Sequence, residues 1–302
     1  MSGHAVRKAF IRQFVGFQKY PSVVAYGIVA SYGLQLAGAI GFGYWLLQHP
    51  FGLSVGLMLA ATMLFIGTRL RGFNNIVHEC SHATFADSLK DNVRCGSICA
   101  SMVLGCFKDY RAEHMTHHAH LGDYDKDMDL QGIRDLHLEA PITFFTVLRH
   151  ILTPLVGLHL PYYLGANLSR ADGVWFLVFK LALIAATGVF TLLDPIAALV
   201  LIWVPFVWVY SSINYWTDCL DHGGLLDLPD ELQASRNIAA PTPVKLILFP
   251  RNDCFHLVHH LFPQIPARHL AVCHERLLAH SDYRHRPVGK RGIPPLGVAG
   301  AA

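Results

Sequence analysis

The sequence predicts an all-α integral membrane protein with four transmembrane helices and a cytoplasmic helical cap. Of its 302 residues, 53% are hydrophobic and only 15% are charged. The mean hydropathy of +0.35 is likewise typical of membrane proteins. Four apolar stretches are long enough to cross a bilayer as helices, and short turns join them into two hairpins, at residues 23–68 and 174–213. We expect a single membrane domain over residues 1–302.

The overall charge and the cysteines indicate which partners and which cellular compartment to expect. The formal net charge at pH 7 is only +3, so nucleic acid is not expected as a partner. Basic residues near the ends of the chain favour an anionic inner leaflet, which makes membrane lipid an expected partner. The seven cysteines include no CxxC pair, and this indicates a reducing compartment rather than a disulfide framework.

Residues 1–20 predict a basic, partly amphipathic arm on the cytoplasmic surface of the membrane. The arm combines apolar and basic side chains: Phe10, Ile11, Phe14 and Phe17 with Arg7, Lys8 and Arg12. The apolar run from Val23 to Leu47 is not followed by a recognisable cleavage site. We therefore expect an uncleaved membrane helix rather than a signal peptide.

The distribution of charge sets the expected topology. Arg69 and Arg71 follow the second span, whereas the turn at residues 48–50 contains neither Lys nor Arg. Because Lys and Arg are in excess on the cytoplasmic side of membrane proteins, we place the N-terminus and the chain from residue 70 in the cytoplasm. The second hairpin turns at residues 194–195 and returns the chain to the same side, so both termini are cytoplasmic.

Residues 76–140 and 214–280 are predicted to form the cytoplasmic cap. Lys180 lies near the cytoplasmic end of its span, and we expect its ammonium group to reach the lipid headgroups. Residues 281–302 are rich in basic residues, Gly and Pro, a composition typical of a flexible tail.

Three shorter segments are predicted to lie outside the spans. Residues 93–107 are apolar but too short to cross the bilayer, which favours a re-entrant or interfacial helix. Residues 141–165 are apolar but interrupted by one arginine, two histidines and several prolines, which favours an interfacial segment. The Asp-rich run at residues 123–129 lacks the Gly and closing Glu of a calcium loop, so we expect a solvated loop that caps a helix.

Three histidine-rich blocks indicate the chemistry. They are His78-Glu79-Cys80-Ser81-His82, His114-Met115-Thr116-His117-His118 and His256-Leu257-Val258-His259-His260. Histidines three or four residues apart lie on one face of a helix, and neutral imidazole is a common ligand of iron, zinc and copper. The predicted topology puts all three blocks on one side of the membrane. The sequence therefore predicts a metal site that holds more than one ion.

Two other classes of protein fit part of this pattern. His78-Glu79-x-x-His82 matches the HExxH motif of zinc proteases, in which Glu79 is the general base, but this class leaves the other two blocks unexplained. A metal transporter places polar ligands near the middle of the bilayer, where the predicted spans have almost none. Other histidines, among them His120, His150 and His159, are expected to be solvated or interfacial, and Arg251 is a candidate contact for a headgroup or an acidic electron donor.

The three blocks resemble the histidine boxes of membrane-bound fatty acid desaturases and their hydroxylase relatives, which have the forms HxxxH, HxxHH and HxxHH. The similarity continues in the Leu261-Phe262-Pro263 that follows the third block and in the Asp-rich run after the second. It covers roughly residues 76–267. The resemblance implies a non-haem centre of two iron ions (Fe²⁺/Fe³⁺) on the cytoplasmic cap, with O2 as co-substrate.

The resemblance also implies which residues hold the iron. The nine ligands would be His78, His82, His114, His117, His118, His222, His256, His259 and His260. His222 stands where many relatives have a ligand between the last span and the third box. Four positions earlier, Asp218 replaces an amide residue that binds metal through water in some relatives, so Asp218 is a candidate to orient His222 instead. Carboxylates near the ligands in sequence would hold the free ring nitrogens: Glu79, Glu113, Asp218, Asp221 and Asp253.

The activity implied by the resemblance is O2-dependent introduction of a C=C bond into an aliphatic chain, either a fatty acyl chain or a small lipid-like or amino-acid-derived metabolite. A hydroxylase of the same family is the alternative, because both reactions begin by removing hydrogen. The sequence resembles bacterial free-standing members and has no HPGG motif of a fused cytochrome b5. We therefore expect a separate electron donor, a ferredoxin or similar, and a bacterial inner-membrane location with the active site in the cytoplasm.

Overall fold

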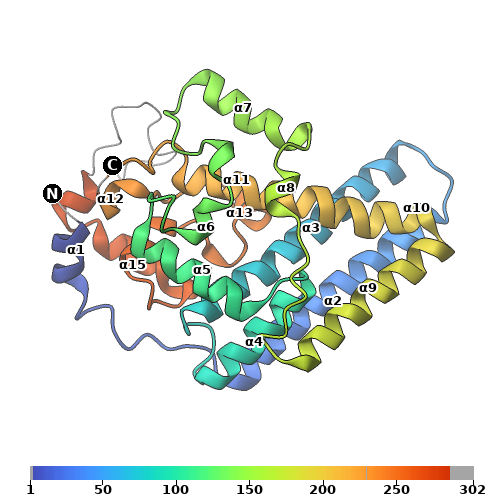
Figure 1. Cartoon of the computed structure of the whole chain (residues 1–302), viewed down its shortest axis with the longest axis horizontal. Coiled ribbons are helices and arrows are strands. Elements are labelled where there is room, and N and C mark those ends of the chain that lie inside the picture. Colours follow the sequence, from blue (N-terminus) through green and yellow to red (C-terminus); the bar gives the residue numbers. More distant parts are fainter. Residues whose placement is uncertain (1–2, 229, 286–302) are drawn as a thin grey trace.

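The computed structural model describes residues 3–228 and 230–285, and this part of the chain is helical (Figure 1). An isolated parallel bridge pairs Tyr20 with Ala86, and the described residues form no strand. The elements are α1 (Gly3–Phe10), α2 (Ser22–Leu47), α3 (Leu53–Ser81), α4 (Leu89–Met102), α5 (Phe107–His120), α6 (Met128–Gln131), η1 (Arg134–Leu136), α7 (Phe144–Leu155), α8 (Leu160–Tyr163), α9 (Val174–Leu193), α10 (Pro195–Ala198), η2 (Leu199–Tyr210), α11 (Ser211–His222), α12 (Glu231–Ala234), α13 (Thr242–Leu248), η3 (Pro250–Asn252), α14 (His256–Leu261), η4 (Ala267–His269), α15 (Leu270–Leu277) and α16 (Ser281–Arg284).

Four helical rods among the described residues are long and apolar enough to cross a membrane. They are α2, α3, α9 and the continuous rod Pro195–His222 that α10, η2 and α11 form, and their mean hydropathies are 1.6, 1.7, 2.2 and 2.1. Figure 1 shows α2, α3, α9 and α10 extending together at one end of the molecule. The prediction of an all-α membrane protein with four transmembrane helices is confirmed, and the arrangement of the spans as two membrane hairpins stays a prediction.

Two of the long rods extend beyond their apolar parts and carry histidines there. The 29 residues of α3 make a helix of roughly 44 Å at about 1.5 Å per residue, against a hydrocarbon core of about 30 Å. The part of α3 that is longer than the hydrocarbon core carries His78 in its last turn and His82 at its C-cap. In the same way, the fourth rod ends at His222. We call the elements at this end of the molecule the cap: α1, α5, α6 and α12–α16 (Figure 1).

The segment predicted to be re-entrant forms α4, which begins at Leu89 and ends at Met102. Cys95 and Cys99 on the inner face of α4 are buried in one apolar cluster with residues of α2 and α3. A Cβ on Gly96 would lie 2.5 Å from the ring of Phe107, so only glycine allows α4 and the first residue of α5 to approach so closely. Its placement in the bilayer interface stays a prediction.

Lys180 differs from its prediction. Its side chain is fully buried and donates to the carbonyl oxygen of Gly105 at 3.1 Å and to that of Asn167. These carbonyls lie in loops with no helical partner of their own, and buried carbonyls need a donor. Lys180 therefore joins the α4–α5 loop to the segment before α9 rather than reaching toward headgroups.

The N-terminal arm also differs from its prediction. Val6, Phe10 and Phe14 are buried in one apolar cluster with residues of the cap such as Leu261 and Phe262. The protein itself therefore covers part of the apolar face of the arm, while Ile11 and Val15 are exposed, and the place of the arm on the membrane surface stays a prediction. The sequence pattern identified an amphipathic segment correctly, but it could not identify what covers the apolar face, because membrane and protein offer the same kind of apolar surface.

Two further expectations concern exposed segments. In α7 the side chains of Phe144, Phe145 and Leu155 are exposed, as an interfacial helix requires, and the interfacial position stays a prediction. The first residues of the tail differ from the predicted flexible segment, because residues 281–284 form α16 and Tyr283 is fully buried. The remainder of the predicted flexible tail, residues 286–302, lies outside the described residues.

Candidate metal centre

Five of the nine predicted histidines form one group, which we call group A: His78, His82, His114, His118 and His259. One ring nitrogen of each lies within 4.8 Å of those of all the others. The Nε2 atoms approach in a chain of close contacts: His78 to His259 at 2.9 Å, His259 to His118 at 3.0 Å, His118 to His114 at 3.1 Å and His114 to His82 at 2.9 Å. All three histidine blocks contribute to this group.

The other four histidines form group B: His117, His222, His256 and His260. All four are buried. The Nε2 atom of His256 lies 2.8 Å from that of His222 and 3.0 Å from that of His260. Group B adjoins group A, since the stacked rings of His118 and His260 have centroids 4.4 Å apart. The structure thus brings all nine predicted residues together and divides them into two neighbouring sets.

The local sequence explains why α5 and α14 serve both groups. In α5, His114 and His118 are four residues apart and share one face, while His117 points about a quarter-turn away toward group B. In α14, His256 and His260 face group B, and His259 faces group A. Each HxxHH block therefore contributes rings to both groups. The HxxxH block differs, because both of its histidines belong to group A.

Carboxylates and one carbonyl hold the ring nitrogens that point away from the groups. Asp127 Oδ2 lies 2.9 Å from His117 Nδ1, and Asp129 Oδ2 lies 3.3 Å from His114 Nδ1. The carbonyl oxygen of Ala234 lies 3.1 Å from His222 Nδ1. Such partners favour a proton on Nδ1, and a neutral ring then has a free lone pair on Nε2.

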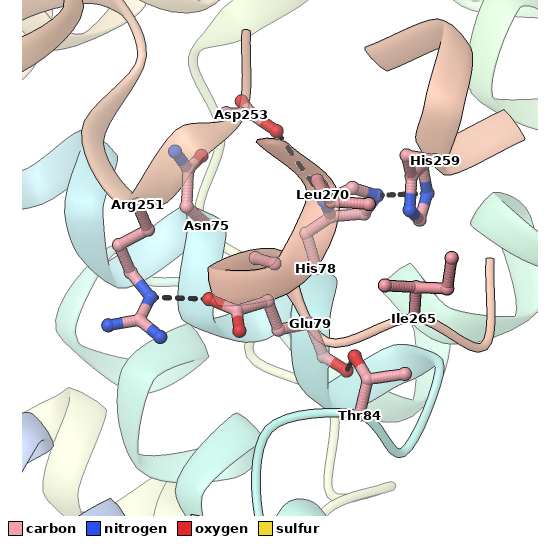
Figure 2. Close-up of a pocket in the computed structure, with 10 residues that line it drawn as sticks. Asn75, His78, Glu79, Thr84, Arg251, Asp253, His259, Ile265 and Leu270 are labelled. Atoms are coloured by element: carbon pink, nitrogen blue, oxygen red, sulfur yellow. Dashed lines mark hydrogen bonds and ion pairs between the residues drawn. The ribbon is translucent and has the colours of Figure 1, made fainter. Parts of the chain in front are cut away.

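Two more carboxylates lie slightly farther from the rings. Asp253 Oδ1 is 3.7 Å from His78 Nδ1, and its other oxygen accepts from Arg71 Nη2 at 2.6 Å (Figure 2 shows His78 between Asp253 and His259). Asp221 Oδ2 is 3.6 Å from His256 Nδ1. Both were predicted to hold ring nitrogens, and both lie on the Nδ1 side of a histidine.

The close approach of the Nε2 atoms fits bound cations. With the proton on Nδ1, neighbouring Nε2 lone pairs would face one another and repel, unless a positive ion lay between them. Two imidazole nitrogens bound at right angles to one ion, at about 2.1 Å each, stand about 3.0 Å apart. The separations of 2.8–3.1 Å between Nε2 atoms match this value. The chemistry of nine neutral imidazoles suits iron, zinc or copper.

Burial keeps most of these rings neutral. It lowers the pKa of His82 to about 3 and the pKa values of His114 and His259 well below the ordinary range, because an imidazolium ion is poorly solvated inside the protein. Burial also acts to lower the pKa of His117, but the hydrogen bond to Asp127 and the charges of the nearby carboxylates Asp129, Asp127 and Asp218 together outweigh it and raise the pKa of that ring. Neutral rings are the form that binds a metal ion.

Three predicted carboxylates do not contact the ring nitrogens that they were expected to hold. Glu79 forms a buried ion pair with Arg251 (Figure 2), and Arg251 therefore does not face a headgroup. Glu113 is exposed on α5. Asp218 accepts a hydrogen bond of 2.6 Å from the hydroxyl of Tyr163, so it does not orient His222. Proximity in sequence was misleading because consecutive residues of a helix point in different directions.

Asp127 and Asp129 were missed as partners of the histidines. The alternating aspartates were expected to be solvated, yet Asp127 is fully buried and both accept from histidines of α5. Asp127 also caps α6 by accepting from the backbone N–H of Leu130 at 3.0 Å, so the capping part of the prediction is confirmed. The only signal in the sequence was the position of these residues directly after the second block.

Among the ten histidines outside the two groups, His120 follows expectation, whereas His159 and His150 have partners that the sequence did not predict. His120 is exposed at the end of α5. His159 is fully buried, and its Nε2 atom lies 2.9 Å from the Ser211 hydroxyl. His150 lies 2.5 Å from the Tyr215 hydroxyl through Nδ1. Both contacts join the α7–α8 region to α11, a role that hydropathy does not reveal.

A polar cavity of about 170 Å³ lies beside the histidines, between α3, α5 and α11. Arg71 lines this cavity and donates hydrogen bonds to Asn214 Oδ1 at 2.9 Å and to Asp253 Oδ2. Tyr163 and Asp218 line it from another side. A space of this size and polarity holds water or a short part of a substrate directly against both groups.

Comparisons with known proteins agree with this geometry. The chain matches the family model for fatty acid desaturases over residues 54–291. It is 26% identical over 227 residues to a dihydrorhizobitoxine desaturase from Bradyrhizobium elkanii, a match that covers 68% of this chain and 63% of the relative. It is 25% identical over 289 residues to an sn-2 acyl-lipid omega-3 desaturase (ferredoxin) of Arabidopsis thaliana chloroplasts, which covers 86% of this chain and 61% of the relative.

A third relative, an sn-1 oleoyl-lipid 12-desaturase from Anabaena variabilis, is 33% identical over 95 residues, or 32% of this chain and 26% of the relative. The chain spans about three fifths of the length of the first two relatives. All three relatives bear the names of desaturases, which are oxidoreductases. Because the family model matches well over half of the sequence, including all nine clustered histidines, this membrane protein belongs to the fatty acid desaturase family.

Proposed function

We propose that the protein is an O2-dependent desaturase that uses two iron ions, one held by group A and one by group B. The observation that carries the proposal is the convergence of nine imidazoles into two adjoining sets, with Nε2 separations of 2.8–3.1 Å. When bound, the iron ions would supply the activation of O2 and the removal of hydrogen from an unactivated C–H bond. The Fe²⁺/Fe³⁺ pair needs electrons from outside the protein.

The residues of the chain itself orient the ligands and balance charge. Nine neutral imidazoles bring no negative charge to two cations, so the nearby carboxylates supply it. Asp127 and Asp129 act on the rings of α5, and Asp253 and Asp221 act on His78 and His256, respectively. The hydrogen bonds from Asp127 and Asp129 favour one tautomer of His117 and His114, and the two more distant carboxylates act on His78 and His256 through their charge.

The cavity beside the histidines is proposed to admit the part of the substrate that reacts. Arg71 is held by Asn214 and Asp253, and the Tyr163–Asp218 hydrogen bond ties α8 to α11 at the opposite wall. Fixed walls keep a chain in one position relative to the metal groups. Such positioning decides whether removal of hydrogen is followed by loss of a second hydrogen or by hydroxylation, so hydroxylation remains the alternative outcome at the same site.

The proposed substrate is an aliphatic chain, either a fatty acyl group or a small lipid-like or amino-acid-derived metabolite. The relatives support both classes, since their names refer to acyl lipids and to dihydrorhizobitoxine. The proposed electron donor is a separate ferredoxin or similar protein, as the name of the Arabidopsis relative indicates for that enzyme. We propose a bacterial inner membrane location, with the cap and both termini in the cytoplasm and membrane lipid around the four spans.

The zinc protease reading finds no support in the site. Its general base would be Glu79, but this carboxylate is buried and forms an ion pair with Arg251. In addition, His78 and His82 share group A with three further histidines, which leaves no open position of the kind that proteases need.

The test is the production of new double bonds in cells that express the full chain with a ferredoxin and its reductase. Mass spectrometry of lipids and of small amino-acid-derived metabolites covers both proposed substrate classes. We expect products that require O2 and disappear in His259→Ala, while His120→Ala, which alters an exposed histidine of α5, retains them. Hydroxylated products would identify the alternative. Equal products from His259→Ala and the wild type would contradict the proposed site.

A further inference from the structure

The third histidine block lies on a helix too short to hold itself in place. The helix α14 has six residues, and isolated helices of fewer than about 12 residues are unstable in water. It nevertheless has to point His256 and His260 toward group B and His259 toward group A. Its orientation therefore depends on the elements that pack against the side opposite the histidines.

The N-terminal arm packs against that side. Leu257 and Leu261 of α14 are fully or nearly fully buried in the same apolar cluster as Val6, Phe10 and Phe14 of the arm. The rings of Phe14 and Phe262 meet edge to face with their centroids 4.9 Å apart. Thus residues more than 240 positions apart in sequence share one core directly behind the histidines.

Arg7 adds a polar contact to the end of α14. Its Nε atom donates to the carbonyl oxygen of Leu261 at 2.8 Å, and its Nη2 atom donates to that of His260 at 3.1 Å. These are the last two carbonyls of the helix, which have no partner within it. A cation at this position also interacts favourably with the negative end of the helix dipole.

The arm is itself fixed on its other side. Arg7 Nη2 lies 3.2 Å from Glu231 Oε2 of α12, and the backbone N–H of Gly3 donates to Asp230 Oδ1 at 2.9 Å. Figure 1 shows α1 beside α12 and α15 at the end of the cap. The arm lies outside residues 54–291, which match the family model.

From these contacts we propose that the arm is a clamp on the third histidine block, with Arg7 as the positioning residue that sets the direction of His256, His259 and His260. This inference rests on the proposed metal site for its effect on metal binding, but the clamp itself is a property of the metal-free protein. Arg7 touches neither metal nor substrate. It acts through α14, by holding the two carbonyls that end it.

Two measurements on the detergent-purified full chain test the clamp in Arg7→Ala, Arg7→Lys and Lys8→Ala. The first is hydrogen exchange of the amides of residues 256–262 without metal. The second is the visible spectrum and the dissociation rate of bound Co²⁺, an ion whose absorption reports the geometry of its ligands. Lys8 is exposed on the same helix and carries the same charge as Arg7, so Lys8→Ala is the matched control.

We expect Arg7→Ala to raise amide exchange in α14 roughly tenfold, as the loss of hydrogen bonds from a charged group predicts. The Co²⁺ spectrum should shift and Co²⁺ should dissociate roughly tenfold faster. Arg7→Lys, which keeps a cationic donor, should restore part of both, and Lys8→Ala should match the wild type. A merely destabilised protein would keep the wild-type Co²⁺ spectrum in its folded fraction.

The clamp is overturned if Arg7→Ala and Lys8→Ala give the same amide exchange and the same Co²⁺ spectrum as the wild type. If the wild type takes up no Co²⁺, the proposed metal site fails, and amide exchange in α14 alone decides the clamp. Faster exchange in Arg7→Ala across the whole protein, rather than within residues 256–262, would also overturn it, because the arm would then stabilise the fold in general.

Discussion

At the residue scale, Asp127 holds one ring of the metal centre from a fully buried position. Its Oδ2 atom lies 2.9 Å from His117 Nδ1, and its other oxygen accepts from the backbone of Leu130. One carboxylate thus orients a group B ring and ends the loop that follows α5. Burial acts to lower the pKa of His117, but the hydrogen bond to Asp127 and the charges of Asp129, Asp127 and Asp218 together raise it.

Replacing Asp127 by Asn should weaken metal binding while keeping the shape of the side chain. The amide lacks the charge that favours the Nδ1–H tautomer of His117, and loss of such a partner typically lowers metal affinity about 10- to 100-fold. Competition with a chelator, followed by elemental analysis, measures the change. The control is Asp123→Asn in the same loop, where the exposed carboxylate pairs with Lys126; equal retention of metal by both variants would refute the role of Asp127.

The metal-free protein should lose stability as the pH falls. Burial lowers the pKa of His82 to about 3 and the pKa values of His114 and His259 well below the ordinary range. Below about pH 6.5 the unfolded chain therefore binds protons that the folded chain does not, and the free energy of unfolding falls. The raised pKa of His117 acts in the opposite sense but belongs to one ring only. Thermal unfolding without metal should give a lower Tm at pH 5 than at pH 7.5, and an equal Tm would count against burial of neutral rings.

Single residues were predicted from sequence to different degrees. All nine histidines of the two groups could be named, eight of them because they stand in the three spaced blocks and His222 because the resemblance to the desaturase family implies a ligand at that place. The partners of their Nδ1 atoms could not be named from the sequence. Asp127 was not expected to contact His117 but does so, whereas Glu79 was expected to hold a histidine and instead pairs with Arg251. A side chain's partner depends on how distant elements pack, and a local pattern does not contain that information.

At the element scale, α5 carries three of the nine clustered histidines and is capped by a residue far away in sequence. Asp172, in the segment before α9, accepts from the backbone N–H groups of Phe107 and Lys108 at 2.7 and 3.0 Å. The first N–H groups of a helix have no partner within it, and a carboxylate there also interacts favourably with the helix dipole. The second hairpin of spans thereby fixes where the second histidine block begins.

Asp172→Ala should lower the stability of the protein by about 1–2 kcal/mol, the usual effect of removing a helix cap. The Tm in detergent measures it. The control is Asp125→Ala, since Asp125 is largely exposed and lies 3.6 Å from Arg134, where little stability is at stake. If both variants have the same Tm as the wild type, the Asp172 contact does not stabilise α5.

The long helices were more predictable than the short ones. The predicted span from Val23 to Leu47 corresponds to α2, which begins one residue earlier at Ser22. By contrast, α14 has only six residues, and its preceding residues Arg251 and Asn252 adopt positive φ angles of 68° and 64°. Hydropathy identifies a span from its own residues, whereas α14 is held by contacts with Val6 and Phe10 from the opposite end of the chain.

At the scale of the whole molecule, the account requires the cap on the cytoplasmic side. Single cysteines replacing Lys126 in the cap and His49 in the first hairpin turn should react with an impermeant maleimide from opposite sides of the membrane. Both positions are exposed, whereas six of the seven native cysteines are buried and should remain unlabelled. Labelling of the two positions from the same side would contradict the proposed topology.

The central claim is that groups A and B each hold one iron ion. The most direct measurement is the metal content of the detergent-purified full chain, with His256→Ala beside the wild type. The account predicts about two irons per chain in the wild type and a clear decrease in the variant, because His256 belongs to group B. One zinc per chain and no iron would contradict it and would return the HExxH motif of the first block to consideration.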